Sequence, residues 1–243
     1  MADTPPNVSY GSIEVPSPPH SPRRKMRFPY AAPTFFLLVL IVAIRQHSLL
    51  KQRKSSLLMG SPSNQSTFSL LLLRHANVSE ENTLTMSDFE KPLDPTGESE
   101  AIWVGKMLRK AHIPPPDTVF SSASLRTRET LDLVAAHAQW EDRFPPVQYA
   151  TAWYDLAFDG NHGYRDYLAD VLQSSPFRRV MVVGHNPAIE LLVNQLLPIA
   201  TFIQVPSGSL IEIQFTTMQD WGEIRNAVGA MALFLNPINR DSQ

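Results

Sequence analysis

Residues 68–75, FSLLLLRH, form a continuous apolar run of strand length that ends abruptly at an arginine and a histidine. An apolar run without alternation is typical of a strand buried on both faces, as in a parallel sheet covered by helices. A second apolar run is VMVV at 180–183, and TVFSS at 118–122 is a shorter strand candidate. The three runs therefore predict the central strands of one sheet.

Helical patterns lie between and after these runs. Apolar side chains recur at i, i+3, i+4 and i+7 in three stretches, which begin at Val104, Leu131 and Ile189. Thr96 is the predicted N-cap of the first helix, and Asn186, which a proline follows, is that of the third. The alternation of strands and helices predicts an α/β fold, a three-layer α/β/α sandwich with a mostly parallel sheet.

The length and composition of the chain, and the strand pattern of its C-terminal part, predict one full globular domain. The chain has 243 residues, of which 43% are hydrophobic, and this is enough for a real core. Apolar runs at 209–215 and 230–235 predict a closing, hairpin-like pair of strands with Trp221 in the connection. Cysteine is absent, which excludes a disulfide framework, a cysteine nucleophile and thiolate metal sites.

The N-terminal segment differs in character from the rest. Residues 1–27 are rich in Pro and Ser and are predicted to be a disordered basic tail. Residues 28–45 are predicted to form a single transmembrane helix, because their uncharged run reaches the minimum of roughly 17 residues that spans a bilayer. Residues 46–67 are predicted to be a linker and residues 68–240 the globular domain. A cleaved targeting segment is the alternative for the N-terminal region.

Charge is divided unevenly along the chain. Residues 1–67 carry eight Lys and Arg against two acids, whereas residues 68–243 carry thirteen against twenty-one. An acidic domain is a poor electrostatic match for a nucleic-acid backbone. We therefore expect no nucleic-acid partner, and we expect membrane contact only through residues 28–45.

Charged or imidazole side chains follow each of the three central runs: Arg74 and His75 the first, Arg126 the second and His185 the third. The carboxyl ends of strands in an open α/β sheet line one crevice, so these four residues are expected to converge. Adjacent strand residues point to opposite faces. Arg74 and His75 therefore share a pocket only if the strand breaks at about Leu73.

A cluster of this composition is suited to phosphate. Guanidinium groups bind phosphate oxygens in a bidentate manner, so Arg74, Arg126 and His185 are predicted to hold a phosphoryl group. His75 is the predicted nucleophile, because neutral imidazole has a lone pair and no cysteine competes with it. No metal and no other cofactor is expected, since the histidines lack carboxylate or thiolate companions at ligand spacing and the arginines would repel a divalent cation.

Four motifs resemble the histidine phosphatase superfamily, specifically its small branch of SixA-type phosphohistidine phosphatases. The resemblance covers about residues 68–240 and implies that His75 becomes phosphorylated, while Arg74, Arg126 and His185 complete the phosphate pocket. The catalytic domain is expected to be monomeric. The motifs are LLLRHA (71–76), DFEKPLDPTGESEA (88–101), VFSSASLRTRET (119–130) and VMVVGHNPAIELL (180–192).

The sequence shows no strong general acid, and this bears on the substrate. An alkoxide leaves badly without a proton donor, whereas the imidazole of a phosphohistidine is protonated near its own pKa of about 6.5 and leaves readily. We therefore predict phosphohistidine on a protein as the substrate. One alternative is a phosphomonoesterase for a small molecule or for phosphoserine and phosphothreonine, with Asp155 as the acid. Another is a membrane-tethered phosphate-binding module without turnover. Tyr154 and Tyr164 are expected to be packing residues.

One formal glycosylation sequon, Asn77-Val78-Ser79, begins two residues after His75. A glycan there would obstruct the predicted site. We therefore expect the catalytic domain to face the cytosol, stroma or matrix.

Overall fold

The computed structural model describes residues 67–79, 86–158 and 163–238. The predicted tail and the predicted transmembrane helix lie outside these residues, as does the linker up to residue 66. Within the described ranges, no helix is both long enough and apolar enough to cross a membrane.

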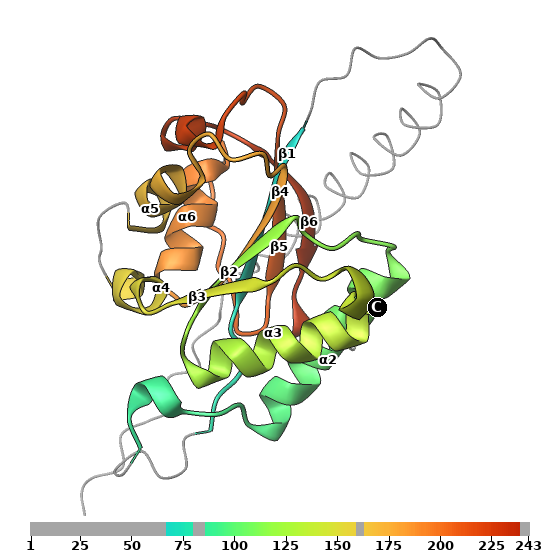
Figure 1. The fold of residues 1–243 in the computed structure, drawn as a ribbon. Helices are drawn as coiled ribbons and strands as arrows, with labels where there is room; N and C mark the ends of the chain where they lie inside the picture. Colours follow the sequence, from blue (N-terminus) through green and yellow to red (C-terminus); the bar gives the residue numbers. More distant parts are fainter. Residues whose placement is uncertain (1–66, 80–85, 159–162, 239–243) are drawn as a thin grey trace, which may run out of the picture. The chain divides into compact units, whose positions relative to one another are not determined.

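The described chain is built around one six-stranded sheet with the strand order β3-β2-β4-β1-β5-β6 (Figure 1). The first four strands of this order are parallel, β5 pairs antiparallel with β1, and β6 pairs antiparallel with β5. The sheet is therefore mostly parallel, as the sequence predicts. The strands are β1 (Phe68–Arg74), β2 (Thr118–Ser122), β3 (Val147–Ala150), β4 (Arg179–Gly184), β5 (Leu210–Phe215) and β6 (Ala230–Leu235).

Helices cover both faces of the sheet. In Figure 1, α2 and α3 lie on one side of the strands, and α4, α5 and α6 lie on the other. The predicted three-layer α/β/α sandwich is confirmed. The helices are α2 (Pro95–Lys110), α3 (Leu125–Ala138), α4 (Ala152–Asp155), α5 (Gly163–Leu172) and α6 (Ala188–Leu196), with short 3-10 turns η1 (Asp88–Glu90), η2 (Glu141–Arg143), η3 (Leu156–Phe158) and η4 (Trp221–Arg225).

Strand β1 supplies side chains to the hydrophobic cores on both faces of the sheet, which explains its uninterrupted run of leucines. Leu70 and Leu72 belong to the core cluster under α5 and α6. Leu71 and Leu73 belong to the cluster under α2 and α3. All four side chains are fully buried. Because successive residues of a strand point to opposite faces, a strand between two helical layers needs an apolar side chain at every position.

Strand β3 is the one element of the sheet that the sequence analysis missed. Its residues, Val147–Ala150, are half-buried or exposed, and the strand lies at the edge of the sheet beside β2. A short edge strand needs no continuous apolar run, so its sequence carries little of the signal that marks the central strands.

The starts of two helices differ from the predicted caps. Asp94, not Thr96, caps α2, because the Asp94 carboxylate accepts a hydrogen bond from the Gly97 backbone N–H at 2.7 Å. Helix α6 begins one residue later than predicted, with Pro187 at the capping position. The Asn186 side chain instead donates to the Val205 carbonyl at 3.1 Å. Asn186 therefore fastens the loop before β5 rather than capping the helix.

Candidate active site

The first predicted pair lies where β1 ends. Arg74 is the last residue of the strand and pairs with Gly184 of β4, so the strand extends one residue further than predicted. His75 follows it, and its backbone N–H donates to the Gly184 carbonyl at 3.0 Å, while its own carbonyl accepts from the Gly208 N–H at 3.0 Å. The backbone of His75 is therefore held by neighbouring chain on both sides.

The ring of His75 is held in one tautomer. Its Nδ1 lies 2.8 Å from the Ala76 backbone carbonyl oxygen. A carbonyl oxygen only accepts hydrogen bonds, so Nδ1 carries the proton. This leaves the lone pair on Nε2. The nucleophilic nitrogen is therefore Nε2, and the second nitrogen is anchored to the protein.

His185 lies beside this ring. It follows the last residue of β4, it is 1% exposed, and its ring centroid lies 5.1 Å from that of His75. Its Nε2 is 2.9 Å from the hydroxyl of Ser122, the last residue of β2. When this hydroxyl donates to Nε2, the proton of the neutral His185 ring resides on Nδ1.

Arg126 enters the same cluster from the first turn of α3. Its side chain is 5% exposed, and its two terminal nitrogens both point at Asp88 of η1. Nη1 donates to the Asp88 backbone carbonyl, and Nη2 donates to the carboxylate oxygen Oδ2 at 2.9 Å. Asp88 therefore holds the guanidinium group of Arg126 through both of its terminal nitrogens.

The cluster presents three buried nitrogens without a hydrogen-bond partner among the described residues. These are Nε of Arg74, Nε of Arg126 and Nδ1 of His185. Each of the three side chains is anchored through another atom; for Arg74 the anchor is the Val205 carbonyl, which accepts from Nη1 at 2.7 Å. Buried polar groups in proteins are normally satisfied. An oxyanion that accepts from several N–H groups is the ligand that this arrangement fits.

Electrostatics keep both imidazoles neutral. Burial lowers the pKa of His75 to about 4, and the charges of Arg126 and Arg74 act in the same direction. Burial also lowers the pKa of His185, with further contributions from His75 and Arg126. Neither ring is protonated near pH 7, so the lone pair on Nε2 of His75 is available for attack.

The donor set does not suit a metal. Apart from the lone pair on Nε2 of His75, the polar groups of the four clustered side chains are N–H donors, and the two guanidinium cations repel a divalent cation. In the part of the chain that the structure describes, no group of three or more His, Asp or Glu residues lies together as a metal site requires.

Two residues of the middle segment lie differently from the prediction. Tyr154 of α4 is more than a packing residue, because its ring contacts the His185 ring edge-on at 5.3 Å and its hydroxyl donates to Oδ2 of Asp88 at 2.7 Å. Asp155, the predicted candidate acid, is exposed. No hydrogen bond or ion pair among the described residues joins its carboxylate to the four clustered side chains, so its role as an acid stays a prediction.

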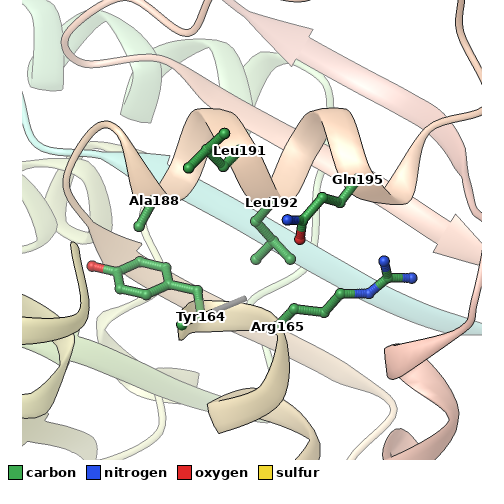
Figure 2. A pocket seen from close by; sticks show the side chains of 7 residues that line it. Tyr164, Arg165, Ala188, Leu191, Leu192 and Gln195 are labelled. Carbon is green, nitrogen blue, oxygen red and sulfur yellow. The ribbon is translucent and has the colours of Figure 1, made fainter. Parts of the chain in front are cut away.

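Tyr164 is a packing residue, as predicted. It is 2% exposed and its hydroxyl donates to the Trp153 carbonyl. Figure 2 shows its ring below Ala188, with the hydroxyl directed away from Arg165. The hollow in that view lies between α5 and α6, and its lining includes none of the four clustered residues.

Sequence reasoning missed Asp88, Ser122 and Tyr154. The first two carried a usable signal. Asp88 opens one of the motifs quoted above, and Ser122 lies at the carboxyl end of a central strand, where a buried hydroxyl needs a partner. Tyr154 carried none, because an aromatic residue in a short helix is most often part of a core.

Sequence comparison agrees with the geometry. Residues 70–164 match the family model of the histidine phosphatase superfamily (branch 1). An uncharacterized chloroplastic protein of Arabidopsis thaliana is 29% identical to the chain over 186 residues, which cover 74% of the chain and 82% of the relative.

Two solved structures have the same fold. A Nakamurella multipartitia protein described as a candidate phosphohistidine phosphatase SixA aligns with a TM-score of 0.56 at 24% identity, over 73% of this chain and 99% of its own. The protein histidine phosphatase SixA in complex with tungstate aligns with a TM-score of 0.56 at 19% identity, over 71% and 99%. Residues 70–164 therefore match the model of the histidine phosphatase superfamily, and the described domain, with its converging Arg74, His75, Arg126 and His185, has the fold of the two SixA structures.

Proposed function

We propose that the chain is a metal-independent phosphatase that hydrolyses phosphohistidine on proteins through a phosphohistidine intermediate on His75. The observation that carries the proposal is the set of three unpartnered N–H groups, on Arg74, Arg126 and His185, gathered around a neutral imidazole. The match of residues 70–164 to the superfamily model supports a phosphatase. The SixA fold fits the phosphohistidine substrate.

The reaction consists of two displacements at phosphorus. In the first, Nε2 of His75 attacks the phosphorus atom, the P–N bond of the substrate breaks, and its electron pair stays on the leaving imidazole nitrogen. In the second, water attacks the phosphorus atom, the bond to Nε2 breaks, and inorganic phosphate is released after the water loses a proton to solvent. The two arginines and His185 stabilise the charge on the phosphoryl oxygens in both steps.

The ionised state of Asp88 and the exposed position of Asp155 favour a P–N bond over a P–O bond. Hydrogen bonds from Tyr154 and Arg126 lower the pKa of Asp88 against the opposing effect of its partial burial, so Asp88 is ionised and has no proton to give. The carboxylate of Asp155 is exposed. A phosphoester needs a proton for its leaving alkoxide, whereas a phosphohistidine ring takes its proton from solvent near neutral pH.

The two alternatives make different demands on this geometry. A phosphomonoesterase with Asp155 as the acid requires that carboxylate to approach the leaving oxygen. A binding module without turnover has no use for a neutral His75 whose Nδ1–H is anchored and whose Nε2 is left basic. Phosphohistidine hydrolysis needs only the nucleophile and the phosphoryl-binding groups of the cluster, and no movement of Asp155.

The test is to trap the intermediate. A peptide labelled with radioactive phosphate on histidine is mixed with the enzyme, and the reaction is stopped within milliseconds in alkaline detergent. Wild type is expected to retain label that mild acid removes, as phosphohistidine does. His75→Ala is expected to retain none. The matched control is His112→Ala, because His112 is exposed and remote from the cluster.

Substrate choice is tested with peptides of one sequence that carry phosphohistidine or phosphoserine. Preferential turnover of the phosphohistidine peptide supports the proposal. Preference for phosphoserine, together with a large Asp155→Asn defect on poor leaving groups only, favours the ester alternative. A wild-type enzyme with no label and no turnover of any phosphorylated substrate leaves only the binding module.

Anchoring and location form a separate part of the proposal. We propose that residues 28–45 hold the catalytic domain, as a monomer, on the cytosolic, stromal or matrix face of a membrane. The chloroplastic relative in Arabidopsis thaliana is compatible with the stromal face. Alkaline carbonate extraction of membranes tests the anchor: the full chain is expected to stay in the pellet. Release of a shortened chain would instead indicate a cleaved targeting segment.

A further inference from the structure

One side of the cluster is formed by a wall of three residues, Asp88 and Phe89 from η1 and Tyr154 from α4. The Tyr154 ring contacts the Phe89 ring edge-on at 5.1 Å and the His185 ring at 5.3 Å. Its hydroxyl donates to Oδ2 of Asp88 at 2.7 Å. The guanidinium carbon of Arg126 lies 5.7 Å from the centre of the same ring. The η1/α4 wall is therefore one connected unit that borders both His185 and Arg126.

The wall carries a negative charge that is open to solvent. The Asp88 side chain is 50% exposed, and its Oδ2 accepts from both Arg126 and Tyr154. Its Oδ1 faces a single cation, Lys91, at 3.2 Å. A carboxylate oxygen has two lone pairs, so Oδ1 retains capacity for a second donor. Asp88 is placed to accept a hydrogen bond from a bound molecule.

The charge of Asp88 also reaches the reacting groups. Burial sets the low pKa of both His75 and His185, and among charged neighbours the carboxylate of Asp88 opposes that shift on each ring. Asp88 therefore lies within electrostatic range of the nucleophile and of the phosphoryl-binding histidine. A positive charge on a ring bound in the same space would be stabilised by it.

A phosphorylated imidazole matches this wall in shape and in charge. Its flat ring fits against the aromatic rings of Phe89 and Tyr154. Protonation of the ring places an N–H on its second nitrogen, directed away from the phosphorus atom, and this N–H is a charge-assisted donor. A leaving alkoxide or phenolate has no such donor and develops negative charge, which the carboxylate repels.

We propose that the η1/α4 wall is the leaving-group subsite, in which Asp88 accepts the distal N–H of a protonated phosphoimidazole while Phe89 and Tyr154 contact its ring. The proposal rests on the function proposed above and names the basis of its specificity. As the P–N bond breaks, the electron pair remains on the leaving nitrogen and the proton remains on the distal nitrogen. Imidazole thus departs neutral, and no proton transfer from the protein is required.

The test compares two substrates in wild type and in Asp88→Asn. A phosphohistidine peptide uses the subsite, whereas 4-nitrophenyl phosphate has a good leaving phenolate that carries no N–H. Asp88→Asn is expected to lower the ratio of the two kcat/KM values, phosphohistidine over 4-nitrophenyl phosphate, by about tenfold, the loss expected for one charge-assisted hydrogen bond. The substitution also loosens Arg126, but that change acts on the phosphoryl group and affects both substrates alike.

The matched control is Glu90→Gln. Glu90 lies in the same 3-10 turn, is exposed, and accepts a hydrogen bond from the Ser87 hydroxyl at 2.9 Å. The control removes the same charge from the same turn and is expected to leave the ratio unchanged. Tyr154→Phe keeps the ring and removes one donor to Asp88, so its ratio is expected to lie close to that of wild type. Tyr154→Leu removes the ring and is expected to lower the ratio.

Three outcomes decide between the proposals. A lowered ratio in Asp88→Asn, with Glu90→Gln unchanged, supports the subsite. An equal loss on both substrates means that Asp88 acts only by orienting Arg126, which overturns the subsite and leaves the proposed function standing. A wild-type enzyme that turns over 4-nitrophenyl phosphate but no phosphohistidine peptide overturns both.

Discussion

The hydroxyl of Tyr164 lies directly against the backbone of Gly184. A Cβ atom on residue 184 would come within 2.5 Å of that hydroxyl oxygen and within 2.7 Å of the ring. Gly184 immediately precedes His185, and the buried tyrosine from α5 therefore packs against the chain that positions the second histidine.

Gly184→Ala is expected to destabilise the domain by about 1–3 kcal/mol, because overpacking of a full core forces side chains and backbone to shift. Activity should fall as well, since the shift occurs next to His185. Chemical denaturation and steady-state kinetics measure the two effects. Tyr164→Phe alone removes the donor to the Trp153 carbonyl and is expected to cost about 1 kcal/mol. Combined, the two changes should cost less than their sum; full additivity would contradict the contact.

A tetrahedral oxyanion is expected to stabilise the folded domain. The unpartnered N–H groups of Arg74, Arg126 and His185 bind it only in the native state, so an oxyanion at 100 times its Kd adds about 2.7 kcal/mol to the free energy of unfolding. This corresponds to a rise in Tm of roughly 5 to 10 °C for a domain of this size. Thermal unfolding with vanadate or tungstate measures the shift. Arg74→Met should lose most of it and His112→Ala none; an equal shift in both variants would place the anion elsewhere.

The activity of the enzyme is expected to persist well below pH 6. Burial lowers the pKa of His75 to about 4, so the acidic limb of kcat/KM should have its midpoint near pH 4 rather than near 6.5. Below that midpoint Nε2 is protonated and cannot attack. 4-Nitrophenyl phosphate is a suitable substrate, because it is stable in acid where phosphohistidine is not. A midpoint near 6.5 would show that the histidine is not desolvated.

The same shift links stability to pH. In the unfolded chain His75 binds a proton below about pH 6.5, whereas in the folded domain it does so only below about pH 4. The unfolded state therefore binds more protons between these values, and the free energy of unfolding should decrease as pH falls through this window. His75→Gln is expected to reduce that slope, measured by denaturant titration at each pH.

A buried ion pair lies toward the end of the central strands that is remote from the active site. Arg179 of β4 contacts Glu212 of β5 at 2.6 Å, and the Ser69 hydroxyl donates to the same carboxylate at 2.7 Å. Glu212→Gln leaves the guanidinium group largely buried without its counter-charge, so we expect a loss of about 3 kcal/mol in stability. Five strand positions, about 17 Å, separate Ser69 from Arg74, so kcat should be unchanged.

The double variant Arg179→Met with Glu212→Leu serves as the control, because it removes both charges from the core. Its stability is expected to approach that of wild type. A single variant as stable as wild type would show that solvent reaches the pair.

Much of the fold is readable from sequence because the central strands obey a simple constraint. Buried on both faces, β1 and β4 contain few polar side chains, and the stretches predicted for β1, β2 and β4 match the limits of these strands to within a residue. The edge strand β3 was not predicted, because much of it is exposed to solvent and its sequence therefore needs no apolar run. The cap of α2 is Asp94 rather than Thr96, because Pro95 takes the first helical position and the residue before it becomes the cap.

The site was predictable where topology alone brings residues together. Arg74 ends a strand, His75 and His185 follow strands, and Arg126 lies in the first turn of a helix that follows a strand, so a parallel sheet places them at one edge. Asp88 lies in a 3-10 turn and Tyr154 in a four-residue helix. Elements this short leave no hydrophobic periodicity in the sequence, so their positions could not be predicted. Their contacts depend on tertiary packing between segments 66 residues apart.

The clamped backbone of His75 has a stereochemical consequence. Held by Gly184 on one side and Gly208 on the other, the nucleophile stays in place while the phosphoryl group exchanges its partner twice. Each in-line displacement inverts the configuration at phosphorus, so two in succession restore it. A substrate made chiral at phosphorus with isotopic oxygen and sulfur should therefore yield thiophosphate of retained configuration, whereas direct attack by water would yield its mirror image.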